Sequence, residues 1–143
     1  MKLIIYTDGG ARGNPGPAAA GVVIKNEDGK ILAEFGKYLG ETTNNQAEYQ
    51  ALILALEKAK EMACLPERQG GTEIQCLADS ELMVKQLNHQ YRVRDADLAP
   101  LFLKAWNLST AFKKISFHHI PREKNKEADK QVNDTLDRRP MSS

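Results

Sequence analysis

Four acidic residues stand at places in the sequence where they could carry out metal-dependent chemistry. Asp8 and Asp79 each follow an apolar run, and Glu48 and Asp129 lie in segments with helical periodicity. Carboxylates that lie close together repel one another and stay ionised only when cations neutralise them. Oxygen ligands of this kind select Mg²⁺ or Mn²⁺, and two such ions can promote in-line phosphoryl displacement. Each acidic residue alone is better explained as a turn or cap residue, so the indication depends on all four converging.

A glycine-rich segment follows Asp8 directly. Residues 9–17 contain four glycines and two prolines, which allow unusual backbone angles and close approach of the main chain to a ligand. The segment lacks the Lys-Ser/Thr end of a P-loop and the spacing of a dinucleotide fingerprint. It is a candidate contact loop, with a plain hairpin connection as the alternative. A nucleotide-binding or phosphatase-like domain that uses this loop is a rival functional class.

Apolar patterns predict the elements that must position these residues. Three strand-like runs joined by short turns should form an antiparallel meander, whereas the later strands, separated by helices, should join in parallel. Thr43 and Gln46 have capping-box spacing, which predicts the start of the first helix. The expected strands are 2–7, 19–25, 30–38, 72–78 and 114–120, and the expected helices are 43 to 63 or 64, 80–88, 98–112 and 125–136.

The resulting fold class is α/β. We expect a five-stranded mixed sheet, three antiparallel strands and then two parallel ones, with helices on both faces. Ligands of such sheets collect at the carboxyl ends of parallel strands, so Asp8 and Asp79 should lie side by side. Alanine recurs at every fourth position of the first helix, which gives a small apolar stripe able to lie close to the sheet. The stripe is Ala47, Ala51, Ala55 and Ala59.

Length and composition limit the classes of protein. The 143 residues, 41% hydrophobic and 27% charged, predict one folded domain over residues 1–137 with a tail at 138–143. Apolar runs are far shorter than the roughly 20 residues that span a bilayer, and no signal region precedes the first strand, so a cytoplasmic location is expected. The net charge of +1 means that a nucleic acid would be met locally. Cys64 and Cys76 are expected as reduced thiols, with a bridge left open.

Four sequence blocks together resemble type 1 ribonuclease H. They occur in order over residues 2–136, and each contains one of the four acidic residues. The blocks are Tyr6-Thr7-Asp8-Gly9-Gly10 with Gly13-Asn14-Pro15-Gly16-Pro17, then Thr42-Thr43-Asn44-Asn45-Gln46-Ala47-Glu48, Ala78-Asp79-Ser80 and Asn125-Lys126-Glu127-Ala128-Asp129.

The resemblance implies a ribonuclease H-like fold and an endonuclease that cuts the RNA strand of RNA/DNA hybrids, leaving 5′-phosphate and 3′-hydroxyl ends. By position, Asp8 would bridge two Mg²⁺ ions, with Mn²⁺ as an alternative metal. Glu48 would hold one ion and lie near the RNA 2′-hydroxyl, Asp79 would hold the ion near the attacking water, and Asp129 would complete the other site. The alternative is a catalytically inactive nucleic-acid-binding domain of the same fold.

The resemblance also implies how the hybrid is bound. The loop after the first strand and the start of the first helix would contact the minor groove, where backbone and amide groups can recognise a 2′-hydroxyl. Thr43, Asn44 and Asn45 have a competing role as helix-start residues. A monomer is expected, and double-stranded RNA is a further candidate substrate. The implied contact residues are Gly9, Gly10, Asn14, Thr43, Asn44 and Asn45.

Some features differ from many bacterial members of this family. The connection at residues 120–124 is short and has no histidine, and Arg122 takes the candidate catalytic position, as in an archaeal-like branch. His119 is the weaker candidate for that role. Residues 89–97 are short and near neutral where some members have a basic, tryptophan-containing handle. Trp106 is expected in the core instead.

Overall fold

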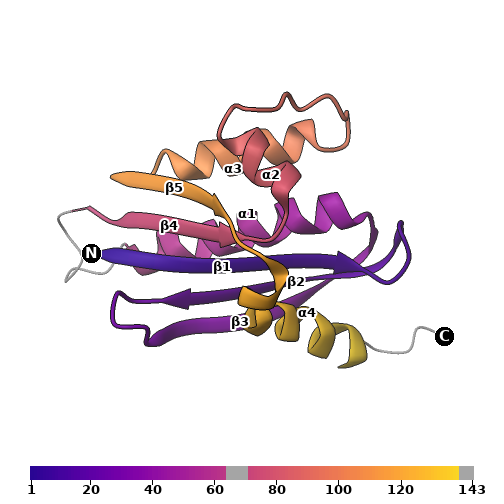
Figure 1. The fold of residues 1–143 in the computed structure, drawn as a ribbon, viewed down its shortest axis with the longest axis horizontal. Coiled ribbons are helices and arrows are strands. Elements are labelled where there is room, and N and C mark those ends of the chain that lie inside the picture. Colours follow the sequence, from indigo (N-terminus) through magenta and orange to yellow (C-terminus); the bar gives the residue numbers. More distant parts are fainter. Residues whose placement is uncertain (64–70, 139–143) are drawn as a thin grey trace.

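The computed structural model describes residues 1–63 and 71–138. Its centre is a five-stranded sheet with the order β3-β2-β1-β4-β5 (Figure 1). The first three strands pair antiparallel, and β1–β4 and β4–β5 pair parallel, which confirms the predicted mixed sheet. The strands are β1 (Lys2–Ala11), β2 (Gly16–Lys25), β3 (Ile31–Thr42), β4 (Glu73–Ala78) and β5 (Lys114–His119).

The β1–β2 hairpin is longer than the sequence predicts. β1 continues past Asp8 to Ala11, because β2 starts at Gly16 and pairs with it along this whole segment. Most of the predicted glycine-rich loop is therefore strand, and only residues 12–15 form the turn. Asp8 lies inside β1 and not at its end, one residue after Thr7↔Ala78, the last pair of the β1–β4 ladder.

Helices cover both faces of the sheet. They are α1 (Asn44–Ala63), α2 (Glu81–Leu87), α3 (Ala99–Ser109) and α4 (Lys126–Arg138), with a 3₁₀ turn at Arg122–Lys124. Successive strand residues point to opposite faces. A Cβ on Gly9 would overlap the backbone of α1, whereas one on Gly10 would meet Val132 of α4, so α1 and α4 lie on opposite faces.

The local signals for α1 are borne out. Thr43 Oγ1 accepts a hydrogen bond from Gln46 N, and Gln46 Oε1 accepts one from Thr43 N, each at 3.2 Å, which is the reciprocal capping box. The predicted alanine stripe is fully buried, with each of its four side chains at 0% exposure. Small side chains allow α1 to lie directly on β1 and β2 and so place Glu48 at the sheet.

Glycines also bring α4 close to the sheet. Gly21 and Gly36 are partners in the β2–β3 register. A Cβ on Gly21 would overlap the Ala128 carbonyl, and one on Gly36 would lie 2.7 Å from the Gln131 carbonyl oxygen. The backbone of α4 therefore rests on bare strand backbone.

A few expectations are revised or fall outside the described residues. Trp106 is only partly buried and packs against His89 and Phe102, at ring-centroid distances of 4.8 and 6.4 Å, instead of joining the main core. Arg138, assigned to the tail, ends α4. Cys76 is a buried free thiol whose pKa is raised by burial, and Cys64 and the tail beyond 138 lie outside the described residues. No helix in the described part of the chain is long and apolar enough to cross a membrane.

Candidate active site

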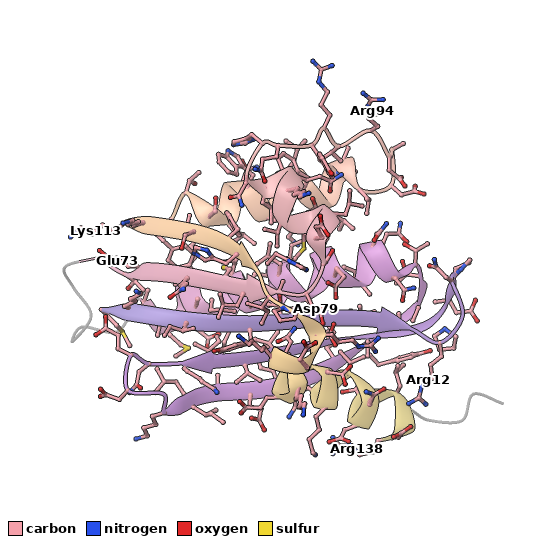
Figure 2. The ribbon with its side chains drawn as sticks, in the orientation of Figure 1. Arg12, Glu73, Asp79, Arg94, Lys113 and Arg138 are labelled. Carbon is pink, nitrogen blue, oxygen red and sulfur yellow. The ribbon has the colours of Figure 1, made fainter. Side chains whose placement is uncertain are left out.

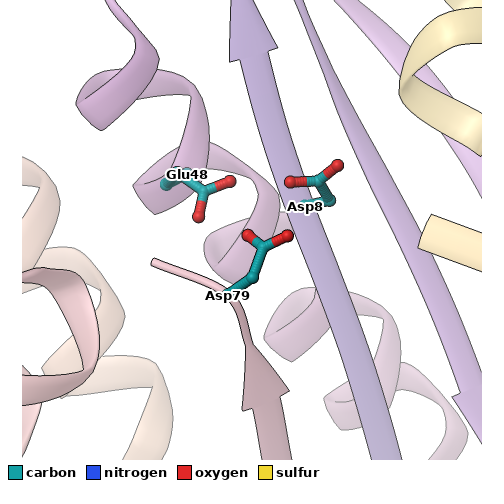
Figure 3. A group of neighbouring side chains, drawn as sticks. All are labelled: Asp8, Glu48 and Asp79. Carbon is teal, nitrogen blue, oxygen red and sulfur yellow. The ribbon is translucent and has the colours of Figure 1, made fainter. Parts of the chain in front are cut away.

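Three carboxylates meet at the edge of the sheet where β1 and β4 separate. Asp8 comes from β1, Asp79 follows β4 directly, and Glu48 comes from the first turns of α1. One oxygen from each lies within 4.8 Å of the others, and the three side chains point toward one another (Figure 3). The predicted adjacency of Asp8 and Asp79 is confirmed.

Glu48 is held in place by its contact with β1. The Gly9 amide donates a hydrogen bond to Glu48 Oε1. This bond requires α1 to approach β1 so closely that any side chain at position 9 would overlap Ala47. Gly9 thus has a packing role here, in addition to the contact role that the resemblance implies.

Asp129 is the fourth carboxylate, in the first turn of α4. It lines the same cleft as the other three but is not in the group of oxygens within 4.8 Å of one another, and its charge helps to raise the pKa of Asp8. Its Oδ1 lies 3.8 Å from a guanidinium nitrogen of Arg122, and its Oδ2 accepts a hydrogen bond of 3.3 Å from Asn133. Asn133 was not predicted as a site residue, although its spacing of four from Asp129 places it on the same helix face.

Burial and mutual repulsion disfavour the charged forms of the clustered carboxylates. Burial, and then the charge of Asp79, raises the pKa of Asp8 from 3.8 to about 7. Burial raises the pKa of Glu48 well above its usual range, with further contributions from Asp8 and Asp79. A divalent cation would offset this repulsion, and an all-carboxylate donor set suits Mg²⁺ or Mn²⁺. The residues present therefore fit a metal site.

We expect the metal-free protein to lose stability as the pH rises through about 7. A pKa that is higher in the folded than in the unfolded chain means that the folded state binds more protons, so the free energy of unfolding falls with pH. The contribution of Asp8 is fully present below pH 4 and is lost as its folded-state pKa of about 7 is passed. Urea unfolding in chelator at pH 5, 7 and 8.5 measures this, and stability that rises over the range would contradict it.

Among the predicted contact residues, Asn14 of the β1–β2 turn lies against the start of α1, whereas Gly9 and Gly10 are in β1. Asn14 Oδ1 accepts a 3.0 Å hydrogen bond from the Asn44 amide, and Asn44 Oδ1 accepts one of 2.8 Å from Ala11. Both side chains thus join the β1–β2 turn to α1, while in the described part of the chain their NH₂ groups have no protein partner. Asn45 is exposed, and Thr43 is the cap residue of α1.

Of these residues, Asn44 lines an open cleft of about 520 Å³ together with the four acidic residues, whereas Asn14, Thr43 and Asn45 are not among the described residues that line it. Arg122 lines it, with 81% of its side chain exposed. Arg12, which sequence reasoning did not single out, also lines the cleft and forms a 2.7 Å ion pair with Asp137 at the end of α4. The sequence around Arg12 does not indicate that it lies in the cleft, because the acidic residue that it pairs with is at the far end of the chain.

One further expectation concerns His119, the weaker candidate for the catalytic position. His119 is exposed and is not among the described residues that line the cleft. Arg94 lies in the connection between α2 and α3 and points away from the sheet, far from Asp79 in the view of Figure 2. Of the two candidates, Arg122 and not His119 is therefore among the described residues that line the cleft.

Comparison with known proteins agrees with this arrangement. A sequence family described as Reverse transcriptase-like matches residues 6–135. Ribonuclease HI of Halobacterium salinarum is 45% identical over 136 residues, 95% of this chain and 65% of that protein. The crystal structure of RNase H1 from this archaeon has a TM-score of 0.88 at 43% identity and covers 96% of this chain and 98% of that one.

Two more relatives extend the comparison. LC11-RNase H1, whose crystal structure is in complex with an RNA/DNA hybrid, has a TM-score of 0.87 at 46% identity, over 94% of this chain and 96% of that one. A bifunctional protein of Mycobacterium tuberculosis is 39% identical over 144 residues, all of this chain but 38% of that protein. The chain thus spans less than two thirds of the length of these curated relatives. Sequence family, fold and close structural relatives agree that the chain belongs to the type 1 ribonuclease H family.

Proposed function

We propose that this chain is an endonuclease that hydrolyses the RNA strand of RNA/DNA hybrids and leaves 5′-phosphate and 3′-hydroxyl ends. The observation that carries the proposal is the meeting of Asp8, Glu48 and Asp79 within 4.8 Å, with Asp129 beside them. It is supported by the relative LC11-RNase H1, whose structure holds an RNA/DNA hybrid. We also propose that the chain acts as a monomer in the cytoplasm.

The four carboxylates would hold two Mg²⁺ ions, with Mn²⁺ as the alternative. Bound there, the ions would supply an activated water and would stabilise the charge that develops on the phosphate. Asp8 fits the shared ligand, because the charges of both Asp79 and Asp129 act on it. Gly9 orients Glu48 through its amide, and Asn133 orients Asp129 through its side chain.

Recognition of the hybrid would use the contact residues at the start of α1. The NH₂ groups of Asn14 and Asn44 can donate to a groove, since their oxygen atoms are held within the protein. Asn45 and the Gly10 backbone add further polar groups beside them. A 2′-hydroxyl both donates and accepts, which lets such groups distinguish RNA from DNA. Double-stranded RNA offers the same hydroxyls and is a second candidate substrate.

The test compares three matched duplexes in Mg²⁺: a hybrid, double-stranded RNA and double-stranded DNA. We expect cuts in the RNA strand of the hybrid, products whose ends a ligase can rejoin, and no cuts in DNA. Tight hybrid binding without cleavage would instead support the inactive nucleic-acid-binding domain. The presence of all four carboxylates favours the active enzyme over that alternative.

Replacing Arg122 with alanine should slow turnover more than it weakens binding. Its guanidinium is 3.8 Å from Asp129 and highly exposed, so it can reach a phosphate at the cluster. We expect kcat to fall about tenfold, less than the roughly 10²–10³-fold loss for a preorganised donor, with KM little changed. Arg94→Ala is the matched control, because Arg94 is an arginine outside the cleft. An equal effect of the two substitutions on kcat would show that Arg122 has no special role.

A further inference from the structure

Asn125 is a buried polar residue that the proposed function leaves without a role. It is 1% exposed and immediately precedes α4. Its side-chain Nδ2 donates a 2.8 Å hydrogen bond to the carbonyl oxygen of Thr7, across 118 positions of sequence. Thr7 directly precedes Asp8 and belongs to the last pair of the β1–β4 ladder. The bond therefore joins the start of α4 to β1 at the residue next to Asp8.

The backbone of Asn125 bonds two more segments of the site. Its amide donates to the Arg122 carbonyl at 3.0 Å, and its carbonyl accepts from the Asp129 amide at 3.0 Å. One buried residue is thus bonded to Asp129, to the residue that carries the candidate guanidinium, and to the neighbour of Asp8. These segments come from opposite ends of the chain.

The side chain does not do what an asparagine in this position usually does. The residue before a helix normally uses its side-chain oxygen to accept a hydrogen bond from an amide of the first turn. Here Asn125 Oδ1 is buried and has no hydrogen-bond partner among the residues that the structure describes. Leaving a buried acceptor unpaired destabilises the folded state. The side chain is therefore arranged for its bond to Thr7 and not for capping the helix.

Other contacts also hold α4 against the sheet. Its backbone lies on Gly21, its Val132 packs with Ala19, and its Glu127 forms a 2.6 Å ion pair with Lys25. These contacts are with β2, whereas Asp8 is on β1. The bond from Asn125 to Thr7 supplies a fixed point one turn before Asp129.

We propose that Asn125 is a positioning residue that sets the separation of Asp129 from Asp8, and through it the affinity of the carboxylate cluster for divalent cations. The inference rests on the proposed function in that it takes the cluster to be a metal site. It does not require that the bound nucleic acid be a hybrid.

Two substitutions separate this role from helix capping. Asn125→Ala removes the bond to Thr7 altogether. Asn125→Ser keeps a good capping hydroxyl but is too short to replace the amide reaching Thr7. Asn88→Ala is the matched control, since Asn88 Nδ2 also donates to a strand carbonyl, that of Phe117, at 3.0 Å, and Asn88 does not line the cleft.

Mg²⁺ binding is measured by calorimetry and by the rise in Tm that Mg²⁺ causes, at a temperature where urea unfolding shows every variant to be folded. Loss of a residue that orients a metal ligand typically weakens metal binding about 10–100-fold. We expect a loss in this range for both Asn125 variants, a smaller Tm rise, and unchanged Mg²⁺ binding in Asn88→Ala. On a hybrid, kcat should fall with KM within about threefold of the unsubstituted chain.

Folded Asn125 variants that bind Mg²⁺ as tightly as the unsubstituted chain would overturn the proposal, even if they were less stable. Recovery of Mg²⁺ affinity by Asn125→Ser alone would also overturn it, because capping would then be the role of the side chain. If the unsubstituted chain cuts no hybrid but the Asn125 variants still lose Mg²⁺ affinity, the proposed function fails and the positioning role stands.

Discussion

Asp8→Asn is expected to abolish cleavage of a hybrid and to make the metal-free protein more stable. Asp8 is the carboxylate on which both Asp79 and Asp129 act, so its loss removes the ligand that two ions would share. We expect cleavage to fall by more than about 100-fold, the upper end of the loss caused by removing an outer-shell partner of a metal site. Mg²⁺ affinity measured by calorimetry should fall with it.

The gain in stability has the same electrostatic cause. Asp8 is 8% exposed, so burial and the neighbouring carboxylates destabilise its charged form. The asparagine side chain carries no charge and does not have this cost. At pH 8 in chelator we expect Asp8→Asn to raise the free energy of unfolding by on the order of 1–3 kcal/mol. This increase should disappear below about pH 4, where Asp8 is protonated in both states. Asp28→Asn, in the exposed β2–β3 turn, is the control and should change neither stability nor cleavage. Asp8→Asn protein that cuts a hybrid within tenfold of the original rate would show that the site is assigned wrongly.

Gly9→Ala is expected to damage both the fold and the site, whereas Gly10→Ala leaves the fold intact. A Cβ at position 9 would overlap the Ala47 carbonyl and the Glu48 amide, and α1 would have to move away from β1. Overpacking of this kind costs typically about 1–3 kcal/mol. The shift would also break the Gly9 bond that orients Glu48, so Mg²⁺ affinity and kcat should fall together.

Gly10 provides the comparison at the neighbouring position. A Cβ there would lie 3.6 Å from Val132 Cγ1, which is an ordinary contact. The free energy of unfolding of Gly10→Ala should therefore differ from that of the unsubstituted chain by no more than about 0.5 kcal/mol. Urea unfolding and Mg²⁺ calorimetry of the two variants make the test. Equal stability of Gly9→Ala and Gly10→Ala would contradict the close packing of α1 on β1.

Local signals in the sequence were sufficient for much of the fold. Thr43 and Gln46 mark the start of α1 because capping depends on residues three apart, and the buried alanine stripe is visible as a repeat of four. Asp8 and Asp79 could be placed side by side because connection rules make their strands parallel neighbours. Each of these inferences uses short-range spacing or general topology.

Features that depend on pairing between distant residues were missed. The extension of β1 to Ala11 follows from its partner strand, not from the composition of residues 8–11, which is typical of a turn. The bonds of Asn125 to Thr7 and of Arg12 to Asp137 span almost the whole chain. No local pattern indicates which side chain will meet which carbonyl or carboxylate after folding.

The most direct test of the metal-dependent site is cleavage of a hybrid labelled on its RNA strand, first in chelator and then after Mg²⁺ is added back in steps. A metal site formed by the four carboxylates predicts no cleavage in chelator and full recovery of cleavage as the Mg²⁺ concentration rises, with the DNA strand intact throughout. Cleavage of the RNA strand that continues undiminished in chelator would contradict a carboxylate-held metal as the source of the activity.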